Sequence, residues 1–90
     1  MKKTIITVVG EDTVGIIAKV STFLAESKIN ILDISQTIMG DTFTMIMMVD
    51  TALSEKTFDE INDNLKAIGE ELNVNIIIQN EKLFSAMHRI

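Results

Sequence analysis

The segment from Gly10 to Ile16, GEDTVGI, joins glycine and a carboxylate to the expected start of a helix. In the first turn of a helix the backbone N–H groups, here of Gly15, Ile16 and Ile17, lack intrahelical partners and can donate to a carboxylate. The Asp12 side chain can accept hydrogen bonds from an ammonium group. These groups together suit a zwitterion such as a free amino acid. An ordinary strand-to-helix turn, with Asp12 as the helix cap, explains the same residues without a ligand.

The methionines are the next candidates, because thioether sulfur suits soft metals such as Cu(I). The group consists of Met39, Met45, Met47, Met48 and Met87. The chain has no cysteine and one histidine to complete such a site. Adaptable packing in the core or at an oligomer interface explains methionines without a metal, so we expect no metal site.

Residues suited to catalysis are few. His88 is the only histidine, and no serine or cysteine lies at a recognisable spacing from it. One group of acidic residues lies outside the expected apolar stripe of the second helix: Asp59, Glu60, Asp63, Glu70 and Glu71. A solvated helix face explains them better than a pair of catalytic carboxylates. We therefore expect no catalytic residue, no cofactor and no enzymatic activity.

Composition narrows the class of protein further. Ninety residues make one domain, and the net charge of −5 argues against nucleic acid as a partner. No stretch of about 18 apolar residues occurs, so we expect no membrane span. The absence of cysteine fits a reducing compartment, and we expect the protein in the cytoplasm.

Apolar periodicity predicts the elements that position these residues. Strands are expected at 2–9, 30–39, 42–50 and 74–79, with a hairpin turn at Gly40-Asp41. A helix is expected at 14–27, and a second one follows Ser54 as its N-cap and ends at Asn73. Their buried stripes are Ile16, Ile17, Val20, Phe23 and Leu24 in the first helix, and Phe58, Ile61, Leu65, Ile68 and Leu72 in the second.

The order βαββαβ predicts an α+β, ferredoxin-like sandwich with a four-stranded antiparallel sheet and two helices on one face. We expect this domain at residues 1–80. Residues 81–90 form an amphipathic tail helix in this prediction, with Leu83, Met87 and Ile90 on one side.

Several strands are apolar at successive positions, so the sheet face without helices is also expected to be apolar. Either the tail or another subunit would have to cover it. A homodimer in which the tail helps to cover this sheet face accounts for both the apolar face and the apolar side of the tail. A monomer covered by its own tail is the alternative.

The sequence resembles the ACT domain over about residues 2–80. Asp12-Thr13-Val14-Gly15-Ile16-Ile17 resembles the family pattern after strand 1, and Lys28-Ile29-Asn30-Ile31 resembles its pattern at strand 2. The closing residues, LFSAMHRI, are similar to those of small stand-alone bacterial ACT proteins. Thr13 and Val14 stand where the family often has arginine and proline, which bears on the identity of the ligand.

The resemblance implies a sensor of amino acids. In such domains two subunits commonly pair through the second strand, and the effector lies at their interface. By position, Asp12, Gly15 and Ile16 would hold the ligand from one subunit, and Asn30 and Ile31 from the other. An alternative for Asn30 is a left-handed residue that ends the first helix.

We therefore expect a non-catalytic regulatory module that binds an amino acid or similar small ligand at a homodimer interface. Its signal would have to pass to a regulated protein partner. The alternative function is a protein-interaction or assembly module without a ligand, which uses its apolar sheet face and tail.

Overall fold

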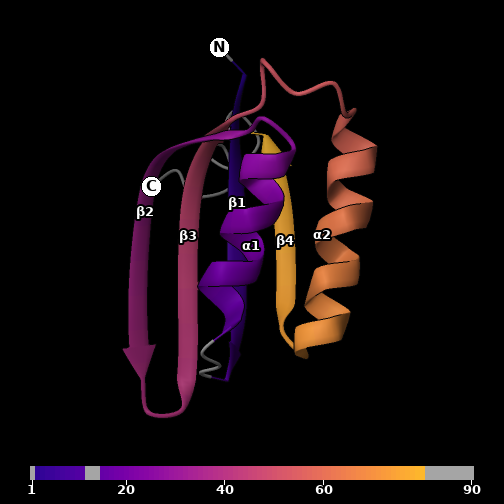
Figure 1. The fold of residues 1–90 in the computed structure, drawn as a ribbon. Helices are drawn as coiled ribbons and strands as arrows, with labels where there is room; N and C mark the ends of the chain where they lie inside the picture. Colours follow the sequence, from indigo (N-terminus) through magenta and orange to yellow (C-terminus); the bar gives the residue numbers. More distant parts are fainter. Residues whose placement is uncertain (1, 12–14, 81–90) are drawn as a thin grey trace.

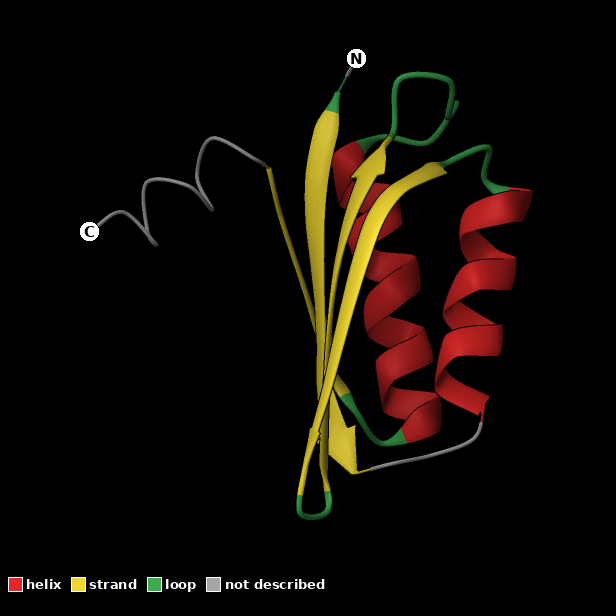
Figure 2. Cartoon of the chain, turned by 90° about the vertical axis from the view of Figure 1, so that its left-hand side faces the viewer, coloured by secondary structure: helices red, strands yellow, loops and turns green. Residues whose placement is uncertain are grey.

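The computed structural model describes residues 2–11 and 15–80, and the predicted tail at 81–90 lies outside them (Figures 1 and 2). The elements are β1 (Lys3–Glu11), α1 (Gly15–Glu26), β2 (Asn30–Met39), β3 (Thr42–Asp50), α2 (Phe58–Leu72) and β4 (Asn75–Asn80). The strands form one antiparallel sheet in the order β2-β3-β1-β4. Both helices lie on one face of it (Figure 2). This architecture confirms the predicted ferredoxin-like fold.

The core lies between the sheet and the two helices. From the sheet it takes Ile6, Val8, Phe43, Met45, Met47, Val49 and Ile78, and from the helices Ile16, Val20, Leu24, Ile61, Leu65 and Ile68. Met45 and Met47 are fully buried within it, where a flexible thioether side chain can fill irregular space. With no aromatic residue other than phenylalanine in the chain, this packing is almost entirely aliphatic.

The start of α2 differs from the prediction. Thr57, not Ser54, is the N-cap: its hydroxyl accepts from the Glu60 N–H at 3.1 Å, and the Glu60 carboxylate accepts from the Thr57 N–H at 2.9 Å. This reciprocal capping box satisfies two N–H groups at once. The Ser54 hydroxyl instead accepts from the Lys56 N–H in the preceding turn. Phe58, expected in the buried stripe, begins the helix and is 45% exposed.

Both helices end through a left-handed residue. Lys28 follows α1 with φ 60°, and Asn73 caps α2 with φ 59°. The alternative interpretation of Asn30 as such a residue is therefore wrong, because Lys28 takes that conformation and Asn30 begins β2. Strand β1 also runs further than expected, through Gly10 to Glu11.

The strand β2 forms one edge of the sheet, and all ten of its residues are exposed. In Figure 1 α1 lies in front of the middle strands and α2 lies beside β4, on the side of the sheet away from β2. Ile34 pairs with Met47 and Ile38 with Phe43. Directly paired residues share a face, so Ile34 and Ile38 lie on the helix side of the sheet, where they remain 39% and 61% exposed.

The opposite face of the sheet is mixed in character. Thr7 lies between Ile46 and Ile77 in the register, and Val9 is paired with Thr44. Isoleucine and threonine therefore alternate in this row, whereas Ile5 and Met48 are paired on the same face, so that apolar and polar residues share a face for which the sequence pattern predicts apolar character. Ile46 and Ile77 are 37% and 46% exposed among the described residues.

Candidate functional site

Gly15 is the first residue of α1 and is exposed. A Cβ added to Gly15 would meet no atom of the chain within 4 Å. The Ile16 side chain is 1% exposed and belongs to the core, so its backbone N–H is the group available to a ligand. Asp12, the predicted partner of an ammonium group, lies outside the described residues. The first turn of α1 thus begins at an exposed residue with free space beside it.

Asn30 and Ile31 begin β2, and both are exposed. Asn30 is paired with Asp50, which is paired with Lys3 at the start of β1. A β-bulge follows between Ile31 and Asp33, so the chain bends directly after the predicted contact residues. The Asn30 amide, which can donate and accept, therefore lies at the end of the sheet where β1 begins.

The two halves of the predicted site lie far apart within one chain. Gly10 is level with Phe43 and Ile38, at the end of the sheet opposite Asn30. Eight residues of strand separate Ile38 from Asn30, which corresponds to about 25 Å. The helix α1 runs back along this length, from Gly15 near the end of β1 to Glu26 near the start of β2 (Figure 1). The structure does not bring Gly15 and Asn30 together in a single copy.

Two carboxylates of the described chain have pKa values shifted by hydrogen bonds. The Asp50 carboxylate accepts from the Ala52 and Lys2 N–H groups, both at 3.0 Å. These bonds lower the pKa of Asp50. The backbone N–H of Thr57, followed by its hydroxyl, lowers the pKa of Glu60. Both shifts favour the charged form and reflect turn and cap geometry rather than a proton-transfer site.

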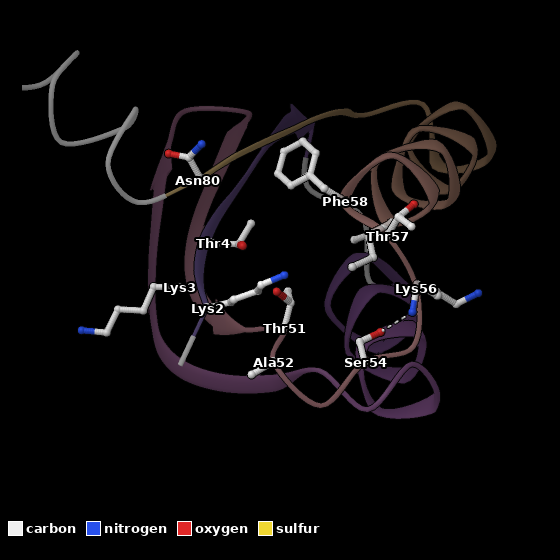
Figure 3. Close-up of a pocket in the computed structure, with 11 residues that line it drawn as sticks. Lys2, Lys3, Thr4, Thr51, Ala52, Ser54, Lys56, Thr57, Phe58 and Asn80 are labelled. Carbon is white, nitrogen blue, oxygen red and sulfur yellow. Dashed lines mark hydrogen bonds between the residues drawn. The ribbon is translucent and has the colours of Figure 1, made fainter.

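A pocket that the sequence reasoning missed lies at the end of the sheet where β1 begins (Figure 3). Its volume is about 650 Å³. The lining residues are Lys2, Lys3, Thr4, Thr51, Ala52, Ser54, Lys56, Thr57, Phe58, Ile61 and Asn80. The sequence signal for it is Lys2 and Lys3 at the start of β1 together with the segment 51–57, which connects β3 to α2.

At residues 2–11 and 15–80, no three histidine or acidic side chains lie close enough together to hold a metal ion. Neither α1 nor α2 is long and apolar enough to cross a membrane.

The βαββαβ order and the four-stranded antiparallel sheet with two helices on one face define the class of small ferredoxin-like domains. The chain belongs to the ACT domain family, whose model matches residues 2–79. ACT domains are regulatory, ligand-binding modules.

Relatives and solved structures agree with this assignment. A UPF0237 protein of Clostridium acetobutylicum is 56% identical over 88 residues, which cover 98% of this chain and 99% of that protein. An ACT domain protein from Streptococcus pneumoniae has a TM-score of 0.81 and 44% identity, covering 97% of this chain and 98% of its own. The ligand-free regulatory subunit of aspartate kinase from Thermus thermophilus has a TM-score of 0.67 and 26% identity, covering 87% of this chain and 50% of its own.

Proposed function

We propose that this ACT domain is a non-catalytic regulatory module that binds an amino acid or a similar small zwitterion between two copies of the chain. The observation that carries the proposal is the separation of Gly15 and Asn30 at opposite ends of the sheet, beside β2, which is an edge strand among the described residues. One copy cannot close a site from both residues. A second copy can supply the missing half.

Antiparallel pairing of β2 with the β2 of a second copy brings the halves together. With the two-fold axis between Ile34 and Ser35, Asn30 of one copy lies opposite Met39 of the other. Met39 is level with Thr42 and, through it, with Glu11 at the end of β1. Asn30 of the second copy thus approaches the end of the sheet where Gly15 begins α1.

The exposed apolar side chains support the same pairing. Ile34 and Ile38 of β2 lie on the helix side of the sheet, and Ile17 of α1 is 39% exposed on that side. Joining two β2 strands would bury such residues against the second copy. This would stabilise the pair by about 25 cal/mol for each Å² of apolar surface removed from water. It would also satisfy the unpaired N–H and C=O groups of two edge strands.

The ligand chemistry follows from the groups at this interface. The N–H groups of Gly15, Ile16 and Ile17 would donate to the ligand carboxylate, and the Asn30 amide of the other copy would bond either end of the zwitterion. Ile31, which is 38% exposed, would contact the ligand side chain, and Asp12 would hold its ammonium group. Similarity to the regulatory subunit of aspartate kinase supports a regulatory role.

A regulatory effect requires that the ligand bind one of two states more tightly than the other. A ligand that touches both copies meets this condition, because it stabilises the dimer relative to the separate chains. The regulated protein partner would then distinguish the dimer from the monomer. We place this activity in the cytoplasm, in keeping with a chain that has no cysteine.

A second candidate function is assembly without a ligand. It is favoured by Ile46 and Ile77, which stay exposed on the sheet face opposite the helices. In that case the chain would join a protein partner through this face, and the first turn of α1 would have no ligand.

Calorimetric titration with each of the twenty amino acids tests the proposal. We expect saturable binding of at least one of them, weakened about tenfold by Asn30→Ala through loss of a hydrogen bond to a charged group. Asn75→Ala is the matched control, since Asn75 is an exposed asparagine at the start of the opposite edge strand. The absence of binding across the whole panel would favour the assembly function.

A further inference from the structure

The pocket of Figure 3, here called the lysine pocket, lies on the helix side of the sheet at the end where β1 begins. Four parts of the chain that are distant in sequence form it: the residues that open β1, the segment after β3, the first turn of α2 and the end of β4. A volume of about 650 Å³ lies within the range of small-molecule sites, which is roughly 300–1,000 Å³.

The charge of the lysine pocket is opposite to that of the chain. The protein carries a net charge of −5, yet the described residues that line the pocket include three lysines and no carboxylate. Figure 3 shows the Lys2 side chain reaching toward the middle of the lining residues, whereas the Lys3 and Lys56 side chains point away from them. The nearby Asp50 carboxylate accepts from the backbone N–H groups of Lys2 and Ala52. The Lys2 ammonium is thus the positive charge directed into the pocket, and Lys3 and Lys56 raise the potential around it only from outside.

The remaining lining groups suit the uncharged part of a ligand. Hydroxyl groups come from Thr4, Thr51 and Ser54, and they can donate or accept. Phe58 is 45% exposed, whereas Ile61, which also lines the pocket, is 2% exposed. An exposed aromatic ring beside an apolar floor offers a stacking surface for a planar ligand group.

The N-terminus of α2 does not itself act as the anion site. The Thr57 hydroxyl accepts from the Glu60 N–H, and the Glu60 carboxylate accepts from the Thr57 N–H. This capping box occupies two of the N–H donors at the start of α2 and puts a carboxylate close to the others. Recognition of an anion must therefore come from the lysine side chains.

We propose that the lysine pocket is a second ligand site, which binds a small organic anion that carries a planar ring. The Lys2 ammonium pairs with the anionic group, the hydroxyls bond the polar atoms, and the planar ring stacks on Phe58. The site lies at the opposite end of the sheet from Gly15 in the same chain, and its lining contains none of the residues assigned to the amino-acid site. Its lining residues are thus distinct from those of the proposed amino-acid site, although Asn30 lies at the same end of the sheet.

The test is a two-dimensional ¹H–¹⁵N NMR titration of the full chain with two probes that differ in their anionic group. Adenosine 5′-monophosphate carries a phosphate, and indole-3-acetate carries a carboxylate. Adenosine has the planar ring without the anionic group, and inorganic phosphate is an anion without the ring. We expect at least one complete probe to shift the amide signals of residues 51–58 saturably, with about tenfold tighter binding than either half.

Variants localise the charge and the ring. Lys2→Gln should weaken binding about tenfold and leave the fold intact, because Lys2 bonds Asp50 through its backbone. Phe58→Leu should weaken binding of the complete probe but leave binding of inorganic phosphate unchanged. The control is Lys66→Gln, which removes the same charge from an exposed position of α2 outside the pocket.

Three results would overturn the proposal. The first is that neither complete probe shifts residues 51–58. The second is that Lys66→Gln weakens binding as much as Lys2→Gln, which would indicate attraction by overall charge. The third is that Asn30→Ala abolishes binding, which would place the anion at the amino-acid site. Failure of the amino-acid titration would leave the lysine pocket unaffected.

Discussion

Gly10 and Val74 approach so closely that a Cβ on Gly10 would lie 2.5 Å from Val74 Cγ1 and 3.2 Å from Val74 Cα. Any side chain larger than hydrogen at this position would displace Val74, the residue that precedes β4. Gly10→Ala should therefore destabilise the fold by about 1–3 kcal/mol through overpacking. Urea unfolding followed by circular dichroism measures this change.

Gly15→Ala is the control for that variant. A Cβ at Gly15 meets no atom within 4 Å, and alanine is a better helix former than glycine. We expect the free energy of unfolding to be unchanged or slightly raised. If both variants lower the free energy of unfolding equally, the close contact between Gly10 and Val74 is not the cause of the loss.

The capping box of α2 gives a second prediction. Thr57→Ala removes the hydroxyl that accepts from the Glu60 N–H and should cost about 1 kcal/mol of stability. Ser54→Ala removes a hydroxyl that serves only the turn at Lys56 and should cost less. Thermal unfolding of both variants measures the difference, and a larger loss for Ser54→Ala would contradict the placement of the helix start.

Acid stability depends in part on Asp50. Its pKa is lowered from the ordinary value of 3.8 by the Ala52 and Lys2 N–H groups. A carboxyl group whose pKa is lower in the folded state stabilises the fold at pH values above its pKa in the unfolded state. This contribution is lost as the pH falls through its pKa in the folded state. Asp50→Asn should therefore reduce stability at pH 7 and flatten its decline below about pH 4.

Urea midpoints of the wild type and Asp50→Asn, measured from neutral pH to pH 3, provide the test. The matched control is Asp63→Asn, an exposed aspartate on α2. A steeper acid decline in Asp50→Asn than in the wild type would contradict the assignment of these hydrogen bonds.

The buried methionines should behave as packing residues. Met45 and Met47 are fully buried in the core, and exchange for leucine nearly conserves volume. Met45→Leu should cost less than about 1.5 kcal/mol, whereas Met45→Ala should cost about 2–5 kcal/mol by leaving a cavity. Chemical unfolding of the two variants distinguishes them. Similar losses would show that the sulfur itself is needed.

The proposed dimer is tested by charge at the two edges of the sheet. Ile34 on β2 and Ile77 on β4 have similar exposure, 39% and 46%, but lie on opposite edge strands. Ile34→Glu should convert a dimer into a monomer in analytical ultracentrifugation, because it buries a charge at the interface. Ile77→Glu should leave the dimer intact. The reverse result would indicate association through β4 or the sheet face without helices.

The sequence predicted the element order because each element carries a strong local signal. The stripe of Ile16, Val20 and Leu24 has helical spacing, and all three residues are buried. Glycine and aspartate at 40–41 mark the hairpin between β2 and β3. The bounds of β2 and β3 were predicted to the residue, since turn residues limit these strands on both sides.

The start of α2 was harder to predict because several residues from Ser54 onward could cap it. Ser54 is a good cap by type, but Thr57 has glutamate three residues later, which completes a capping box. The residue types of Ile31 and Ile34 do not predict that they lie on an exposed edge strand. Apolar periodicity predicts which face of the sheet a residue occupies, but not the order of the strands. The sequence does not predict the lysine pocket for a related reason, because its residues come from four separate segments that the fold brings together.

The ten exposed residues of β2 also bear on solubility. A long edge strand with isoleucine at several positions is a template for further strands, and repeated addition leads to fibrils. In the proposed dimer a symmetric partner strand would end this growth after one step, because each copy would use its β2 edge in the pair. Dilution or loss of the partner would therefore expose the protein to aggregation.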